Sequence, residues 1–163
     1  MKKVIVHKSA VPIYIAAGVW AVYALVFPMF KVGHFAIAAA VALEMGVPMV
    51  FAKKHKSSNV DGKVYTAVVH SYTHGTDYTI VVSSDYLGEN DRVLLVDDFL
   101  ANGKALVGLT ELVRQAGGTV VGAAIAIEKG FQGGGDALRA EGVRVESLAI
   151  VDSMTDDAIT FRN

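Results

Sequence analysis

Two nearly continuous apolar runs in the carboxyl-terminal half constrain the fold of this chain more than any other feature. They cover residues 93–96 and 119–127, and between them the segment from Lys104 places leucine and valine at helical spacing. A last strand is predicted at 143–151. Uniformly apolar strands are typical of a parallel sheet covered on both faces, and strands that alternate with helices are typical of α/β proteins. The sequence therefore predicts an α/β fold with an open, mainly parallel sheet and helices on both faces.

The other elements are predicted from local signals such as turn residues, caps and β-branched runs. Two β-rich arms at 64–71 and 78–83 indicate a hairpin or mobile flap with a polar tip at 72–77. The remaining predictions are an alanine-rich helix at 35–45, a strand at 47–52, a flexible stretch at 130–135 and a short helix capped by Asp136.

Residues 10–30 form a stretch whose location the sequence leaves open. The run carries no charged residue and is long enough to cross a bilayer as a helix, with lysines before and after it. A soluble alternative divides it into a short helix near 13–20 and a buried strand at 22–27, because Pro12 and Pro28 limit a continuous helix. A secretory signal is a third interpretation, although the phosphate chemistry predicted below suits the cytoplasm better.

Composition argues against several classes of function. A formal net charge of -1 gives no electrostatic reason to expect nucleic acid as a partner. The chain has no cysteine, which removes disulfides, thiol nucleophiles and cysteine-based zinc sites. His70 and His74 have a helical spacing but lie among β-forming residues, so a metal site there is not favoured. We expect a single domain over residues 1–163, of which 1–30 is atypical.

Two aspartates and a small-residue loop follow the first apolar run. Asp97 and Asp98 come directly after residues 93–96, residues 99–103 indicate a tight loop, and helical periodicity begins at Lys104. In open α/β sheets ligands bind beyond the carboxyl ends of the strands, where a helix amino terminus offers N–H groups to an anion. This order of strand, carboxylates, loop and helix predicts a site for a phosphorylated sugar.

Several of the candidate residues also have a plain structural interpretation. A doubled aspartate after a strand is as compatible with a helix cap as with a ligand site. Lys53 and Lys54 end a predicted strand and either face solvent or face a pyrophosphate at the edge of the sheet. Lys129 by itself suits a surface position, and we expect Phe99 and Phe131 to pack in the protein rather than to stack on a base.

Five segments, in this order along the chain, carry a resemblance to a known family. They are Gly46–Lys54, Val64–Ala67, Val96–Ala105, Ile127–Gln132 and Arg144–Leu148. From about Phe35 to Val151 the chain resembles the type I phosphoribosyltransferases, and most closely their bacterial members that use xanthine. The resemblance implies the type I fold and the transfer of ribose 5-phosphate from phosphoribosyl pyrophosphate to xanthine or a related 6-oxopurine in purine salvage.

The resemblance also implies roles for two groups of residues in binding the sugar phosphate. Asp97 and Asp98 would act as the catalytic carboxylates and hold the ribose 2- and 3-hydroxyls, directly or through magnesium. The 5-phosphate would lie on a loop whose N–H groups and small side chains permit close approach. That loop consists of Ala101, Asn102, Gly103, Lys104 and Ala105.

Further roles implied by the resemblance concern the leaving group, the base and the assembly. Lys53 and Lys54 would face the pyrophosphate, where positive charge stabilises the negative charge that grows as the glycosidic bond breaks. Lys129 would donate a hydrogen bond to a purine carbonyl. The flap near 71–77 would close over the reacting centre and exclude water. The expected assembly is a homodimer, for which an apolar amino-terminal face would suit the interface.

Two stretches depart from the family pattern. By register from Gly46, Lys31–Phe35 occupies the place of the family's Glu-Ala-Ser-Gly-Ile loop for pyrophosphate, and residues 1–30 have no counterpart of the hood over the base. Besides a salvage enzyme, the sequence thus leaves open a non-catalytic protein that binds a phosphoribosyl ligand or uses it in regulation. It also leaves open a diverged homologue whose amino terminus is altered or associates with a membrane.

Overall fold

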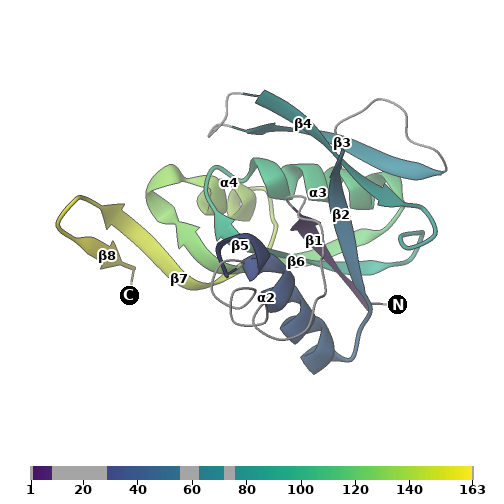
Figure 1. Cartoon of the computed structure of the whole chain (residues 1–163), viewed down its shortest axis with the longest axis horizontal. Coiled ribbons are helices and arrows are strands. Elements are labelled where there is room, and N and C mark those ends of the chain that lie inside the picture. The colour runs from purple at the N-terminus through teal and green to yellow at the C-terminus, as the bar shows by residue number, and fades with distance from the viewer. Residues whose placement is uncertain (1, 9–28, 56–62, 72–75, 163) are drawn as a thin grey trace, which may run out of the picture.

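The computed structural model describes residues 2–8, 29–55, 63–71 and 76–162 of the chain (Figure 1). Within them, the strands are β1 (Lys2–Lys8), β2 (Met49–His55), β3 (Val64–Ser71), β4 (Thr76–Ser83), β5 (Arg92–Leu100), β6 (Thr119–Lys129), β7 (Val145–Met154) and β8 (Ile159–Phe161). The helices are α2 (Met29–Met45), α3 (Lys104–Gln115) and α4 (Gly134–Ala140), with a short 3-10 helix, η1, at Gly130–Gln132. This succession of strands and helices confirms the predicted α/β class.

The described strands form one sheet in the order β3-β4-β2-β1-β5-β6-β7-β8. Its five central strands, β2, β1, β5, β6 and β7, run parallel to one another. The hairpin of β3 and β4 joins β2 in the antiparallel sense, and β8 pairs antiparallel with β7. The sheet is therefore mainly parallel, as predicted, and the hairpin forms one of its edges.

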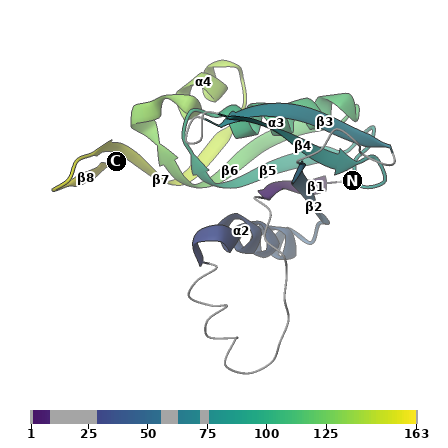
Figure 2. The same cartoon turned by 45° about the horizontal axis from the view of Figure 1, so that its top comes forward.

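Helices cover both faces of this sheet (Figure 2). Leu106, Leu109 and Leu112 of α3 pack with alternate residues of β5, such as Leu95, in the larger core. Ala38 and Ala42 of α2 pack with Val96, the next residue of β5, in a smaller core. Because successive strand residues point to opposite faces, a strand in this position needs apolar residues throughout. The uniform apolar run that indicated a parallel sheet has this origin.

Three strands extend beyond the ends that hydropathy predicts. β2 continues through Lys53 and Lys54 of the basic run at 53–56, β6 reaches Lys129, and β5 reaches Leu100. Phe99 and Leu100, which the sequence analysis assigned to a loop, pair with Ile127 and Glu128 of β6. Pairing with a neighbouring strand keeps these segments extended whatever their polarity, so the loop after β5 begins later than predicted.

The amino-terminal elements also differ from the expectation. Helix α2 begins at Met29, earlier than the predicted start at Phe35, because no proline lies between Pro28 and Pro48 to interrupt it. No strand was predicted for Lys2–Lys8, yet β1 lies between β2 and β5 in the centre of the sheet. Lysines at both ends and a histidine within these seven residues hide the short apolar run from a hydropathy criterion.

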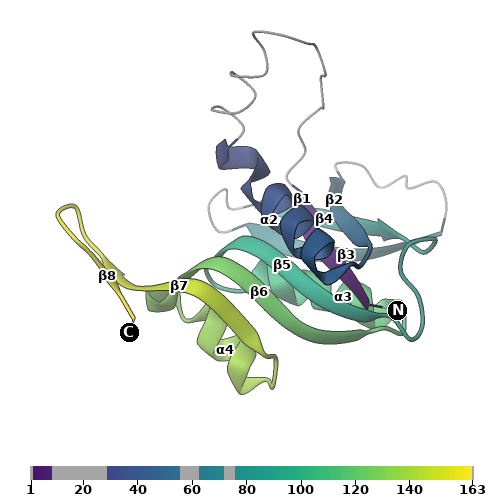
Figure 3. The ribbon, with the colours of Figure 1, turned by 90° about the horizontal axis from the view of Figure 1, so that it is seen from below.

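The last strand, β8, was missed for a different reason. It has three residues, all exposed, and pairs with the end of β7 in an arm that extends away from the helices (Figure 3). Such a short strand is defined by its partner rather than by a periodic pattern.

No helix within the described residues is long and apolar enough to cross a membrane. The helix predicted near 13–20 and the strand predicted at 22–27 lie outside the described residues.

Candidate active site at the carboxyl edge of the sheet

The parallel strands bring most of the predicted site residues to one edge of the sheet. Strand pairing aligns one residue from each central strand in a single row, namely Phe51, Val6, Val96, Ala124 and Glu146. Lys53 and Lys54, Asp97 and Asp98, and Lys129 all lie on the carboxyl side of this row in their respective strands. Ligands of open α/β sheets bind at this edge.

The two aspartates occupy positions that suit ligand binding. Asp97 is 7% exposed and Asp98 is half-buried. Oδ1 of Asp97 accepts the Asp98 N–H at 3.0 Å, which fixes the carboxylate against the backbone of β5. Neither aspartate is the N-cap of α3, a position that Gly103 fills. The helix-cap interpretation of the acidic pair is therefore wrong.

The loop at 101–103 turns the chain from β5 into α3. Gly103 is buried and adopts a left-handed conformation with φ of 80°, which glycine tolerates best. Oδ1 of Asn102 accepts the Lys104 N–H at 3.3 Å, and the Gly103 carbonyl accepts the first helical bond, from Val107. Lys104 is exposed and Ala105 half-buried at the helix amino terminus, where N–H groups lack partners within the helix.

The basic run reaches the site through Lys54. Lys53 is exposed, whereas Lys54 is half-buried and its Nζ lies 3.8 Å above the centre of the Tyr78 ring. Burial, with a smaller contribution from the negative charge of Asp97, raises the pKa of Tyr78 above its ordinary value. Tyr78 of β4 thus contacts Lys54 and is close enough to Asp97 for the charge of that carboxylate to act on its pKa. Tyr78 was not predicted from the sequence as a site residue, because a tyrosine in a strand carries no signal beyond its β propensity.

On the other side of the aspartates, Lys129 stands beside an aromatic ring. Its Nζ lies 5.8 Å from the centre of the Phe99 ring. Phe99 is 51% exposed and Phe131 is 47% exposed, and neither belongs to a core cluster. The expectation that both rings pack inside the protein is wrong, because Phe99 near the end of β5 and Phe131 in η1, directly after β6, are both exposed.

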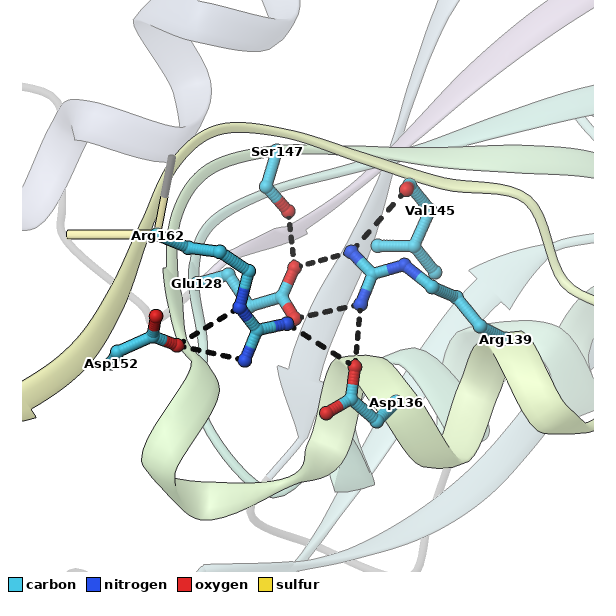
Figure 4. A network of polar contacts seen from close by, with 7 residues as sticks. All are labelled: Glu128, Asp136, Arg139, Val145, Ser147, Asp152 and Arg162. Carbon is cyan, nitrogen blue, oxygen red and sulfur yellow. Dashed lines mark hydrogen bonds and ion pairs between the residues drawn. The ribbon is translucent and has the colours of Figure 1, made fainter.

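A buried carboxylate lies directly before Lys129. Glu128 is 1% exposed and accepts two hydrogen bonds from Arg139 of α4, at 2.8 and 2.6 Å, and one from the Ser147 hydroxyl at 2.6 Å (Figure 4). The Arg139 hydrogen bonds lower the pKa of Glu128 most, followed by that from Ser147, against an opposing effect of burial. Asp136 and the exposed pair of Arg162 and Asp152 extend the network.

The dependence of the free energy of unfolding on pH, between neutral and acidic pH, tests this ion pair. A carboxyl group whose pKa is lowered on folding contributes stability above its unfolded pKa, about 4.3 for glutamate, and loses that contribution as pH falls further. We expect Glu128→Gln to have a lower free energy of unfolding than the unchanged protein at pH 7. The difference between the two free energies should narrow below about pH 4. Urea unfolding from pH 7 to 3 measures it, with Asp156→Asn as an exposed control. A difference that stays constant with pH would contradict this role.

The glycine-rich stretch before Arg139 is ordered into helices. Residues 130–132 form η1, and α4 begins at Gly134. No side chain caps α4; Asp136 lies in its first turn and pairs with Arg139 at 3.1 Å. The predicted flexibility is wrong, because at Gly134 and Gly135 the space beside the backbone is filled by neighbouring backbone and carboxylate atoms. The predicted cap is wrong because Gly133 occupies the N-cap position.

The predicted flap corresponds to the hairpin of β3 and β4. Its arms agree with the prediction, and the tip at 72–75 lies outside the described residues. His70 forms a hydrogen bond with Asp77 across the hairpin, and His74 is not described. Among the described residues no group of three or more histidine, aspartate or glutamate side chains could hold a metal ion. Residues 31–35, the counterpart of the family's pyrophosphate loop, belong to α2.

Comparison with known proteins agrees with this geometry. Residues 31–137 match the model of a protein family described as "Phosphoribosyl transferase domain". The matched segment contains the aspartates, the loop at 101–105 and all three candidate lysines. The chain belongs to this family.

Individual relatives narrow the similarity. The chain is 54% identical over 133 residues to a xanthine phosphoribosyltransferase from Alkaliphilus metalliredigens, a match that covers 82% of this chain and 66% of the relative. It is 58% identical over 130 residues to one from Bifidobacterium adolescentis, covering 78% and 67%. These matches span about two thirds of the length of the curated relatives.

Solved structures share the fold at lower identity. An adenine phosphoribosyltransferase from Rhodothermus marinus superposes with a TM-score of 0.67 at 24% identity, covering 93% of this chain and 70% of that chain. One from Giardia lamblia superposes with a TM-score of 0.67 at 23% identity, covering 94% and 71%. These likenesses confirm the type I phosphoribosyltransferase fold.

Proposed function

We propose that this chain is a purine phosphoribosyltransferase that transfers ribose 5-phosphate from phosphoribosyl pyrophosphate to xanthine or a related 6-oxopurine. The observation that carries the proposal is the placement of Asp97, Asp98 and the loop at 101–105 on one strand-to-helix connection at the carboxyl edge of the sheet. Identity of more than half to proteins named xanthine phosphoribosyltransferase supports xanthine over other bases.

Each group has a role that follows from its chemistry. The N–H groups at the start of α3 and the Asn102 amide bind the 5-phosphate, and the carboxylates of Asp97 and Asp98 accept hydrogen bonds from the ribose hydroxyls. As the bond to pyrophosphate breaks, Lys53 and Lys54 stabilise the charge on the leaving group. Lys129 donates to a carbonyl of the base, and the neighbouring Phe99 ring supplies an apolar surface.

Magnesium fits the two aspartates as a partner of the substrate. Mg²⁺ is usually held by one or two carboxylates together with substrate phosphates and water, and two adjacent carboxylates are the donors present at this point. The ion would neutralise part of the pyrophosphate charge. Asp97 and Asp98 would orient the ribose with or without direct contact to it. A homodimer and a cytoplasmic location stay predictions from the sequence.

The direct test is the conversion of labelled xanthine to its nucleoside monophosphate by the purified chain with phosphoribosyl pyrophosphate and Mg²⁺. We expect one pyrophosphate released per nucleotide formed, and a higher kcat/KM for xanthine than for adenine. Guanine and hypoxanthine assayed in parallel define the base preference. No product with any of the four bases, from protein shown to be folded, would contradict the proposed activity.

A non-catalytic protein that binds a phosphoribosyl ligand is the second candidate. It is favoured by one observation: residues 31–35, in the register of the family's pyrophosphate loop, belong to helix α2. Binding of phosphoribosyl pyrophosphate without turnover would favour this alternative over the enzyme.

Tyr78 offers a test of how Lys54 is held. A cation above an aromatic face contributes roughly 0.5 to 2 kcal/mol. Tyr78→Leu removes the ring beneath the ammonium, so we expect KM for phosphoribosyl pyrophosphate to rise roughly 2- to 30-fold. Tyr78→Phe keeps the ring and serves as the matched control, with KM within about twofold. Steady-state kinetics distinguish them. An equally large rise in KM in both variants would show that the hydroxyl matters instead, and no rise in either would contradict a role of the ring in holding Lys54.

A further inference from the structure

The backbone of Gly134, at the start of α4, is in direct contact with the loop at 101–103. Its N–H donates to the Ala101 carbonyl at 3.2 Å. A Cβ placed on Gly134 would overlap that carbonyl oxygen and lie 2.5 Å from the Asn102 carbonyl carbon and 2.6 Å from the Gly103 nitrogen. Gly134 has no positive φ, so the reason for glycine here is space. Any other residue must push the loop away.

The next residue rests on the buried ion pair. A Cβ on Gly135 would overlap the Glu128 carboxylate and lie 2.9 Å from Nη1 of Arg139. Arg139 belongs to the same helix as Gly134 and binds Glu128 with both terminal nitrogens, while Ser147 of β7 holds the carboxylate from the other side (Figure 4). The amino terminus of α4 is thereby fixed between the end of β6 and the loop after β5.

We propose that Gly134 is a positioning residue for the 5-phosphate loop, and that the Glu128, Arg139 and Ser147 network holds it there. This inference rests on the proposed function of residues 101–105. The loop binds phosphate through backbone N–H groups, whose direction is set by the backbone itself. A displacement of about 1 Å at such a site is sufficient for roughly a hundredfold loss. The network thus acts on phosphate binding through the loop backbone, without touching the ligand.

The experiment compares the affinity of xanthosine monophosphate with that of xanthosine, by calorimetry on the full chain. The dissociation constant of xanthosine divided by that of xanthosine monophosphate measures what the phosphate contributes to binding. We expect Gly134→Ala to lower this ratio at least about tenfold, with affinity for xanthosine nearly unchanged. The control is Gly133→Asn. Gly133 is the residue before Gly134, its φ is 72°, and a Cβ there would meet nothing within 4 Å. Asparagine tolerates that conformation. This control should change the ratio less than twofold.

A second variant keeps the test decisive if Gly134→Ala does not fold. Arg139→Gln, with the exposed Arg144→Gln as control, should lower the same ratio at least about threefold by releasing α4. Loss of folded protein would instead reduce the binding stoichiometry for both ligands equally. An unchanged ratio in folded variants would overturn this inference and leave the proposed function intact. Failure of the unchanged protein to bind the monophosphate would overturn the proposed function itself.

Discussion

Replacing Asp97 or Asp98 by asparagine is expected to lower kcat/KM for phosphoribosyl pyrophosphate at least about 10²-fold, and both together by about 10³-fold or more. An amide removes the negative charge and presents N–H donors where the ribose hydroxyls need acceptors. Asp97 is buried beside Tyr78, so water cannot readily replace the lost acceptor.

Steady-state kinetics with xanthine measure the effect, and Asp156→Asn is the control, because Asp156 lies in the exposed turn between β7 and β8. A loss of less than threefold in the double variant would show that the acidic pair does not act on the sugar. The effect of each single variant then decides which carboxylate dominates.

The second large effect concerns stability. Arg139→Met leaves the Glu128 carboxylate, 1% exposed, without its bidentate partner, and breaking a buried pair in this way costs about 3 to 5 kcal/mol. We expect that loss in urea unfolding at pH 7. Glu128→Leu combined with Arg139→Met removes the stranded charge and should recover most of it, since apolar replacements of a buried pair are often close to neutral.

The control for this cycle is Arg144→Gln, which breaks an ion pair with Glu146 whose side chains are 78% and 69% exposed. It should change the free energy of unfolding by less than about 1 kcal/mol. A similar loss of unfolding free energy in Arg144→Gln and Arg139→Met would contradict the claim that the buried pair is a main contact holding α4 against the sheet.

The sequence predicted the carboxyl-terminal half of the fold well, because its strands are apolar on both faces. Residues 93–96 and 119–127 are recognisable as buried parallel strands, and the start of α3 at Lys104 was predicted correctly. β1 could not be found in this way. Its three apolar residues are flanked by lysines and a histidine, and its place between β2 and β5 is set by long-range pairing.

The residues of the candidate site likewise fall into two groups, those that the sequence indicated and those that it did not. The aspartates and the loop at 101–105 are contiguous in sequence, so local pattern and family resemblance both indicated them as candidates. Tyr78 and Arg139 act through partners far along the chain, Lys54 and Glu128, and a single tyrosine or arginine gives no sign of such a partner. The glycines at 133–135 gave a signal that was misinterpreted as flexibility, whereas two of them are required by close packing.

The central claim is that the connection from β5 to α3 binds a phosphoribosyl group. Calorimetric titration of the purified chain with phosphoribosyl pyrophosphate and Mg²⁺ tests it most directly, with the Asp97→Asn and Asp98→Asn double variant alongside. We predict saturable binding at one site per chain and at least about tenfold weaker binding by the variant. Absence of binding heat with both phosphoribosyl pyrophosphate and xanthosine monophosphate, from folded protein, would contradict the claim.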